Sequence, residues 1–451
     1  MPRIAKKTWF RIHSFTGVIT GLMLFVICWS GTFAVLSQEL DWLVTPEARL
    51  EAIGEPLSHD QLMAAVQREH PGFAVSRIEA PLYERSAVQF VGDLPHQDSV
   101  RIYVNPYSGE VLGAWSYFNL QRFFRSFHME LFLPYFGDYF VVLFALTMLA
   151  SLVAALYFYR RWWRRFFVFS TSPRAFWSDT HKLAGLWSLW FLLVIGLTSA
   201  WYLFEMLRAD VGDGKLSYAA ASTYGARSIP APGSDAGLPL LPLDELVERA
   251  RAARPELRLA TIGFDFSHDG TLYFDGQAGH LLVRDRANQL HLDARSGEVL
   301  YDQRADAYPL YWRWTDTADP LHFGDFAGLG SKLVWFFFGL LLCLLIYTGT
   351  LLHARRLAVG GGRRDRHRWP GTTAAILVTL IVLVAAAIAG AYQVRAWYGP
   401  EFDGVRQFPE LAPGVAAVVA TWTIVTLALL VIWIRLLWRP AAASQGLRRK
   451  V

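Results

Sequence analysis

The chain has 451 residues, of which 53% are hydrophobic and 15% aromatic, and its mean hydropathy is +0.26. Only 18% of the residues are charged, against about 25% in an average soluble domain. This composition argues against a purely soluble protein, and so much apolar material excludes a disordered chain. The net charge of +5 does not indicate a nucleic-acid partner, because the basic residues gather in short segments between apolar stretches.

Six stretches of 20 to 24 residues contain no Asp, Glu, Lys, Arg or His. A helix needs about 20 apolar residues to cross the hydrocarbon core of a bilayer. The first stretch is longer than a signal-peptide core and has no small-residue cleavage site at its end. The sequence therefore predicts an α-helical membrane protein with six retained spans: Ser14–Leu36, Tyr139–Tyr159, Leu183–Phe204, Leu333–Leu352, Gly371–Val394 and Leu411–Ile434.

Lysine and arginine gather in four segments beside these spans: 1–13, 160–182, 353–370 and 435–451. Together the four segments hold 21 of the 43 Lys and Arg residues and only 2 of the 38 acidic ones. Short basic loops remain on the cytoplasmic side of a membrane. We therefore expect both termini in the cytoplasm and two large domains on the opposite face.

An internal repeat runs through the first four spans. Three motifs recur in the same order, at offsets of 168, 188 and 194 residues: W-x-x-x-H-x-x-x-G at Trp9–Gly17 and Trp177–Gly185, S-G-E-V-L at Ser108–Leu112 and Ser296–Leu300, and an apolar residue before His128 and before His322. Each unit is then a span, an outer domain and a second span, in the same orientation. Parallel repeats of this kind are related by a pseudo-two-fold axis along the membrane normal. The last two spans have no counterpart in the repeat.

Each outer domain has the pattern of a helix packed on an antiparallel sheet. The predicted elements are a helix at Leu62–Glu69 with strands at Val75–Ile78, Ala87–Val91 and Val100–Val104, then a helix at Leu243–Arg254 with strands at Leu259–Phe264, Thr271–Asp275, His280–Asp285 and Gln289–Asp293. The Pro-, Gly- and Ala-rich stretch 225–242 is predicted to be a linker.

The predicted organisation has eight parts. They are the N-terminus and first span (1–36), the first outer domain (37–138), the second and third spans with their loop (139–204), the second outer domain (205–332), the fourth span (333–357), a cytoplasmic loop (358–370), the last two spans (371–437) and a tail (438–451).

The repeated heads, the S-G-E-V modules and the histidine before each return span resemble the PepSY-associated transmembrane-helix family, over about residues 8–357. Within that family the chain is similar to the two-haem ferric-siderophore reductases of the Gram-negative inner membrane. The resemblance implies two non-covalent b-type haems, periplasmic outer domains, and electron delivery to a periplasmic ferric siderophore or similar iron chelate. Some relatives also carry a flavin/NAD module. This chain has no G-x-G-x-x-G after a strand, so quinol or a separate cytoplasmic flavin reductase is the expected donor.

Four of the twelve histidines form equivalent pairs at the predicted span edges. His13 and His181 lie at cytoplasmic ends, and His128 and His322 lie at outer ends. A two-fold axis would bring each pair face to face, so that two imidazoles could ligate one haem iron, an arrangement suited to electron transfer. An interfacial histidine is the simpler interpretation of any single one. His353 has no counterpart and is an alternative inner ligand.

Glycines and arginines flank these histidines. Gly17 and Gly185 each follow their histidine by one helical turn, where a missing side chain would admit a porphyrin edge. Close packing between helices is the alternative role for both glycines. Arg122 and Arg125 precede His128 and could pair with haem propionates. Cys28 and Cys343 begin no C-x-x-C-H motif, which excludes covalent haem.

The expected function is therefore a trans-membrane haem-dependent oxidoreductase. Electrons would enter at the inner histidine pair, pass to the outer pair and reduce a ferric chelate, without catalytic acid–base side chains. Two other functions stay open: a non-enzymatic anchored module that binds or regulates a periplasmic partner, and an accessory to chelate transport. The sequence leaves open the chelate, the electron donor, the oligomeric state and the role of the last two spans.

Overall fold

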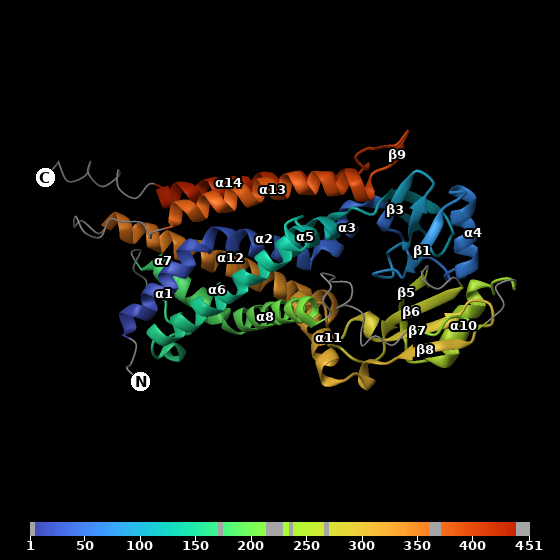
Figure 1. Cartoon of the computed structure of the whole chain (residues 1–451), viewed down its shortest axis with the longest axis horizontal. Coiled ribbons are helices and arrows are strands. Elements are labelled where there is room, and N and C mark those ends of the chain that lie inside the picture. Colours follow the sequence, from blue (N-terminus) through green and yellow to red (C-terminus); the bar gives the residue numbers. More distant parts are fainter. Residues whose placement is uncertain are drawn as a thin grey trace.

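The computed structural model describes residues 5–169, 175–212, 229–233, 238–265, 270–359 and 371–438. A long helical bundle occupies one end of the molecule and a β-sheet with two covering helices occupies the other (Figure 1). Most of the predicted linker 225–242 and most of the loop 358–370 lie outside the described residues. The helical membrane protein and its antiparallel sheet domain agree with the predicted fold class.

Five described helices are long and apolar enough to cross a membrane. They are α6 (Phe136–Phe158), α8 (Leu189–Gly212), α12 (Gly328–Val359), α13 (Thr372–Tyr398) and α14 (Pro413–Trp438). The first predicted span is a bent pair, α1 (Lys6–Ile19) and α2 (Gly21–Val35), whose axes differ by 64°. The side chains of Thr16 and Thr20 donate hydrogen bonds to carbonyls one turn back, a contact that bends helices.

The third predicted span is also divided. A separate helix, α7 (Phe176–Trp187), ends at Ser188, and α8 begins at the next residue. Ser188 follows Thr20 by 168 residues, so the two breaks occur at corresponding positions of the sequence repeat. The expectation of two unbroken spans is therefore replaced by two pairs of helices, each with its histidine on the first member.

The two outer domains form one eight-stranded antiparallel sheet, in the order β4-β3-β2-β1-β5-β6-β7-β8. Its elements are α4 (His59–Glu69), β1 (Ala74–Glu79), β2 (Val88–Leu94), β3 (Gln97–Val104), β4 (Val111–Ser116), α10 (Leu243–Ala253), β5 (Arg258–Asp265), β6 (Thr271–Gln277), β7 (Gln289–Asp293) and β8 (Val299–Gln303). The domains join where Ile78 of β1 pairs with Ile262 of β5. Both isoleucines belong to one buried core with Leu62, Val66, Leu246 and Val247 of the covering helices.

One predicted strand is wrong, and two strands were not predicted. His280–Asp285 forms turns, whereas β4 and β8 follow the two S-G-E-V turns. The segment 280–285 does not pair with β6, because the backbone of β6 pairs with β7 instead. Side chains anchor the intervening segment instead: Val283 is buried, and Arg284 forms ion pairs with Asp319 and Asp325.

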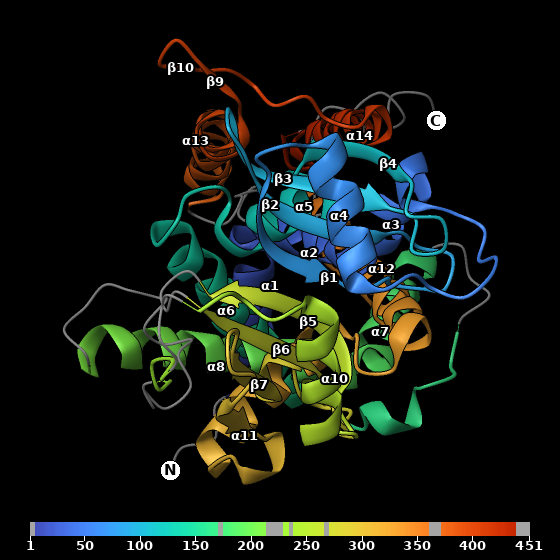
Figure 2. The ribbon, with the colours of Figure 1, turned by 90° about the vertical axis from the view of Figure 1, so that its right-hand side faces the viewer.

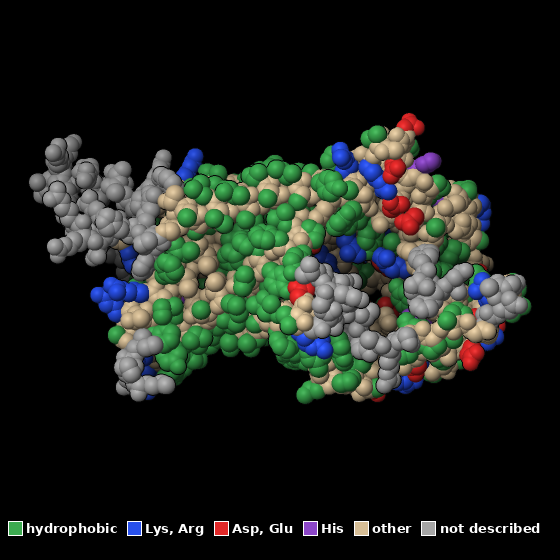
Figure 3. All heavy atoms as spheres, in the orientation of Figure 1, with side chains coloured by type: hydrophobic (Ala, Val, Ile, Leu, Met, Phe, Trp, Pro, Cys, Tyr) green, Lys and Arg blue, Asp and Glu red, His purple; other side chains and the backbone are tan. Residues whose placement is uncertain are grey.

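Three further helices connect the sheet to the bundle: α3 (Ser37–Val44), α5 (Leu120–Glu130) and α11 (Leu310–Phe323). The C-terminal pair α13 and α14 lies along one side of the bundle (Figures 1 and 2). Its connecting hairpin, β9 (Glu401–Phe402) and β10 (Val405–Arg406), reaches the first outer domain, where Arg406 pairs with Asp98 at 2.7 Å. Hydrophobic side chains cover the bundle, and most charged ones lie at its two ends (Figure 3).

Candidate functional site

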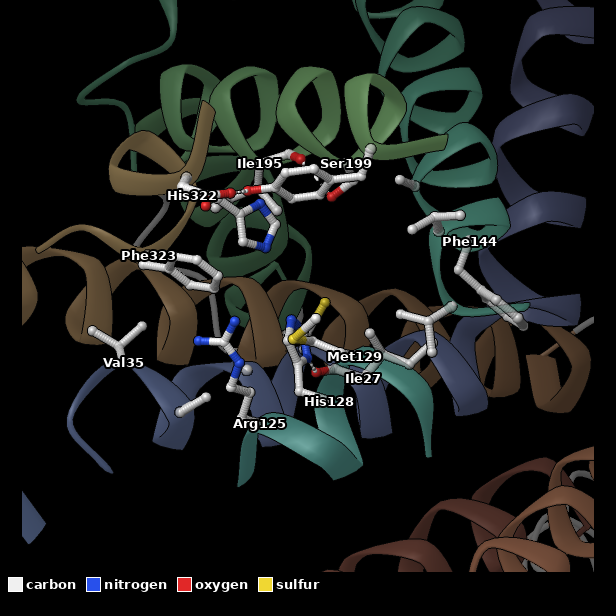
Figure 4. Close-up of a pocket in the computed structure, with 18 of the residues that line it drawn as sticks. Ile27, Val35, Arg125, His128, Met129, Phe144, Ile195, Ser199, His322 and Phe323 are labelled. Atoms are coloured by element: carbon white, nitrogen blue, oxygen red, sulfur yellow. Dashed lines mark hydrogen bonds between the residues drawn. The ribbon is translucent and has the colours of Figure 1, made fainter. Parts of the chain in front are cut away.

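Two pairs of histidines face each other inside the bundle. The ring centroids of His13 on α1 and His181 on α7 are 6.2 Å apart, with an angle of 62° between the rings. Those of His128 on α5 and His322 on α11 are also 6.2 Å apart, with an angle of 32°. These are the two pairs that the sequence repeat grouped. Figure 4 shows His128 and His322 pointing toward one another across a cavity.

A neighbouring helix holds the Nδ1 atom of every one of these imidazoles. The partners are Ser151 O for His13 (3.0 Å), Leu345 O for His181 (3.1 Å), Ile27 O for His128 (2.9 Å) and Thr198 Oγ1 for His322 (2.9 Å). A backbone carbonyl can only accept, so His13, His181 and His128 donate from Nδ1 and keep the Nε2 lone pair for a metal. A hydroxyl can donate or accept, so the contact with Thr198 does not fix the tautomer of His322. Hydrogen bonds of this kind also fix the orientation of the ring.

The spacing of each pair suits a single metal ion between the rings. An imidazole nitrogen binds a metal at about 2.0–2.1 Å, and the ring centre lies roughly 1.1 Å further back. Two imidazoles on opposite sides of one ion would therefore place their centroids roughly 6.3 Å apart. Rotation about the nitrogen–metal axis does not change this distance, so the two different interplanar angles are compatible with the same arrangement.

The outer pair opens into a cavity with about 1800 Å³ of empty space, open solvent included. Apolar side chains of α2, α6, α8 and α12 line most of it. Its charged lining residues include the acidic Asp138, Glu205 and Asp319. Arg125 and Arg286 are also among the charged lining residues. Arg125 and Phe323 flank the histidine pair in Figure 4.

The inner pair opens into a second cavity of about 1560 Å³. Lys182 and Arg356 lie among its lining residues, as does the alternative ligand His353. Three side chains line both cavities: Leu24, Met148 and Leu342. The two cavities are therefore neighbours, one behind the other along the bundle, separated by a thin apolar layer.

The structure places the other predicted site residues as follows. Gly17 and Gly185 both line the inner cavity. A Cβ at Gly17 would meet no atom within 4 Å, whereas one at Gly185 would lie in ordinary contact with Leu345. Arg125 lines the outer cavity, but Arg122 donates a hydrogen bond to the hydroxyl of Tyr117.

Sequence reasoning missed two glycines that make room for the histidines themselves. A Cβ at Gly31 would lie 2.5 Å from the ring of His128, and one at Gly349 would lie 3.1 Å from the ring of His181. It also missed the hydroxyl partners of the outer pair. The hydroxyl of Ser30 lies 3.4 Å from His128 Nδ1, and Thr198, the partner of His322, follows Ser30 by 168 residues. The offset of the repeat therefore contained a signal for these two hydroxyl partners.

Each pair has the donor atoms to offer two ligands to a metal bound between its rings. In the described part of the chain, no group of three or more His, Cys, Asp or Glu side chains gathers where it could hold a metal ion. The donors in the plane between two imidazoles would therefore come from a ligand that brings its own. A flat macrocycle with four nitrogen donors has this chemistry.

The fold and these paired cavities define a multi-pass membrane protein with an α+β domain joined to the ends of its spans. The family model for the PepSY-associated TM region matches residues 10–356, and the chain belongs to this family. This match confirms the family that the repeated motifs indicated. No curated protein matches the sequence.

Proposed function

We propose that this protein is a membrane reductase that binds two b-type haems between its histidine pairs and reduces an iron chelate at the sheet end. The observation that carries the proposal is the geometry of the pairs. Both have centroids 6.2 Å apart, and all four Nδ1 atoms are held by neighbouring helices. One such pair could arise from ordinary packing, but two with the same spacing and anchoring support a common cofactor.

Haem bound in these cavities would supply an iron that changes its charge by one electron with little change in geometry. The chain would ligate this group, orient it and shield it from water. At the outer cavity, Arg125 is suited to hold a propionate by charge-assisted hydrogen bonds, whereas Arg286 already pairs with Asp319 at 2.9 Å. At the inner cavity, Lys182 and Arg356 have the same chemistry.

The proposed substrate is a ferric siderophore or a similar chelate. Chelators with hard oxygen donors hold Fe(III) much more tightly than Fe(II), so the gain of one electron loosens the complex. No protein acid or base is needed for this step, and the protein has only to position the cofactor and the acceptor. We expect the electrons to come from quinol or a cytoplasmic flavin reductase, at the end of the bundle away from the sheet.

Absorption spectra of the purified protein, before and after reduction with dithionite, test the proposal. We expect two b-type haems per chain. His128→Ala should lose one and His13→Ala the other, while His96→Ala, a substitution outside the two cavities, should retain both. The amount of folded protein must be measured for each variant, since a loss of both haems through misfolding would say nothing about ligation.

A colourless, fully folded protein would contradict the proposal. In that case the outer domains would be better interpreted as a binding or regulatory module held at the membrane by the spans. Uptake of a chelate into vesicles without any electron donor would instead favour a transport accessory.

A further inference from the structure

Three arginine side chains surround one buried tyrosine on the sheet face opposite α4 and α10. The guanidinium carbons of Arg77, Arg101 and Arg122 lie 5.0, 4.6 and 4.4 Å from the ring centroid of Tyr117. The arginines come from β1, β3 and α5, so the cluster forms only when sheet and bundle meet. Tyr117 and Arg101 are only 8% and 5% exposed. We call these four residues the arginine cluster.

Two of the guanidinium groups share the tyrosine oxygen. Arg77 Nη2 donates to the hydroxyl of Tyr117 at 2.5 Å, and Arg122 Nη2 donates to the same atom. Burial by itself would raise the pKa of Tyr117, but the nearby charges of Arg122 and Arg101 outweigh burial and hold it below its usual value. The local field therefore favours negative charge at this position.

The carboxylates near the cluster do not balance its charge. Glu79 pairs with Arg77 at 2.8 Å and lies 4.0 Å from Arg101. Asp41 accepts the backbone N–H groups at the start of α5, and burial raises its pKa to about 6. A third carboxyl, Asp275, interacts with Arg77, and burial raises its pKa to about 7. Three permanent cations thus face one paired carboxylate and two weakly acidic carboxyl groups.

Three buried N–H donors in this region have no acceptor in the described part of the chain. They are Arg101 Nε, Arg122 Nε and Trp115 Nε1. Arg101 and Trp115 are direct cross-strand partners on β3 and β4, and Arg101 and Arg122 meet at the same ring. Buried polar groups normally have hydrogen-bond partners. Three donors without acceptors on neighbouring residues point to a ligand that carries acceptor oxygens.

The arginine cluster lies close to the outer cavity. Arg122 precedes Arg125, which lines that cavity, by three residues on α5. At about 1.5 Å per residue, His128 lies roughly 9 Å further along the same helix. Figure 3 shows a hollow between the bundle and the sheet with Lys and Arg side chains at its edge.

We propose that Arg77, Arg101, Arg122 and Trp115 bind an oxyanion, and that its bearer is a carboxylate-containing iron chelate. The identity of the bearer rests on the proposed function, whereas the anion site does not. A phospholipid headgroup offers similar oxygens and is the competing source. The proposal predicts that chelates with a free or metal-bound carboxylate are preferred over hydroxamate chelates that have none.

Binding of gallium(III) citrate to the full-length protein in phosphatidylcholine nanodiscs tests this site. Gallium(III) replaces iron without being reduced, so binding is measured apart from electron transfer. We expect Arg101→Gln and Arg122→Gln each to weaken binding about tenfold, since each removes a charge-assisted contact. Arg68→Gln, on the exposed face of α4, should have no effect. The gallium complex of desferrioxamine, a hydroxamate, should bind more weakly than the citrate complex and respond little to either substitution.

Tyr117→Phe separates ligand binding from a purely structural role. The substitution keeps the ring but releases the N–H groups of Arg77 and Arg122 that donate to the phenol oxygen. Citrate binding should therefore be retained or become tighter. If the cluster only stabilised the fold, Tyr117→Phe would lower the Tm and reduce citrate binding at the same time.

Three results would overturn the proposal. The first is equal citrate binding in wild type, Arg101→Gln and Arg122→Gln. The second is loss of citrate binding in Tyr117→Phe together with a lowered Tm. The third is a combination of two observations. Citrate does not bind in phosphatidylcholine discs, and phosphatidylglycerol stays bound to the wild-type protein but not to Arg122→Gln. The site would then bind a lipid headgroup. Citrate binding by a haem-free protein would support the anion site and contradict only the proposed reductase function.

Discussion

Asp60 and Asp244 each cap the helix that carries the other. The carboxylate of Asp60 accepts the backbone N–H groups of Leu243 and Asp244 at 2.9 and 3.0 Å. The carboxylate of Asp244 accepts those of His59 and Asp60 at 2.8 and 3.3 Å. Backbone N–H groups at the starts of α4 and α10 are therefore hydrogen-bonded across the joint between the two outer domains. These contacts add to the pairing of β1 with β5.

Asp60→Ala should destabilise the joined sheet domain. It leaves two N–H groups at the start of α10 without their acceptor, and loss of a helix cap costs about 1 kcal/mol. Thermal unfolding of the full-length protein would show this as a lowered Tm. Glu248→Ala is the matched control: Glu248 is an exposed residue of α10 paired with Arg251, and surface pairs contribute about 0–1 kcal/mol. Equal Tm values for the two variants would refute the capping role.

Thr198→Val should weaken the outer cofactor site without emptying the inner one. His322 Nδ1 would lose its hydroxyl partner at 2.9 Å, and loss of such a partner costs about 10–100-fold in metal affinity. Haem content and the midpoint potential of each haem report the effect. Thr423→Val is the control, because its hydroxyl donates within α14 to the carbonyl of Val419 and the residue lines neither cavity. An unchanged outer haem in Thr198→Val would argue against His322 as a ligand.

Gly17→Leu should fold normally and still lose the inner haem. A side chain at this position would meet no protein atom near its Cβ and would extend into the inner cavity. Only an occupant of the cavity would then clash with it. The measurements are Tm and the haem-to-protein ratio. Unaltered haem content would show that the cofactor, if present, does not pass this glycine.

Asp275→Asn should stabilise the protein at pH 8 but not at pH 4. Partial burial, with Asp285 and Glu79 nearby, raises the pKa of Asp275 from 3.8 to about 7. The folded chain thus holds this proton more tightly than the unfolded chain. The stability it contributes is complete below about pH 4 and is lost as the pH rises toward 7. Asparagine resembles the protonated form, so it avoids the loss.

The measurement for this prediction is Tm as a function of pH. A difference between Asp275→Asn and wild type should grow from pH 4 to pH 7 and then level off, with roughly 2–4 °C for each kcal/mol in a domain of this size. Asp306→Asn, at an exposed position, should follow wild type at every pH. A constant offset for Asp275→Asn across the whole range would exclude titration of this carboxyl as its cause.

The sequence was a good guide wherever local pattern decides structure. Helix α4 and strands β1, β2 and β3 lie within a few residues of the predicted ranges, because alternation and helical periodicity report a buried face directly. His280–Asp285 shows the limit of this reasoning. Its pattern resembles a strand, yet the segment is held by its own buried Val283 and by ion pairs of its Arg284 with the distant residues Asp319 and Asp325.

The candidate site divides in the same way. The repeat alone grouped His13 with His181 and His128 with His322, since equivalent residues recur at constant offsets. Neither the partners of their Nδ1 atoms nor the clearance at Gly31 and Gly349 could be derived from spacing, because both depend on which helices lie beside the rings. The same holds for Arg122: its place before His128 suggested a haem propionate as partner, and the fold adds a hydrogen bond to Tyr117 that spacing did not indicate.

The sequence by itself determined the apolar stretches, the repeat, the family and which histidines are equivalent, because the hydrophobic effect and motif recurrence act along the chain. The tertiary structure alone decided that the two outer domains share one sheet, that each histidine pair has a spacing of 6.2 Å, and that three arginines converge on Tyr117. These features depend on distances between residues far apart in sequence, and only packing sets such distances.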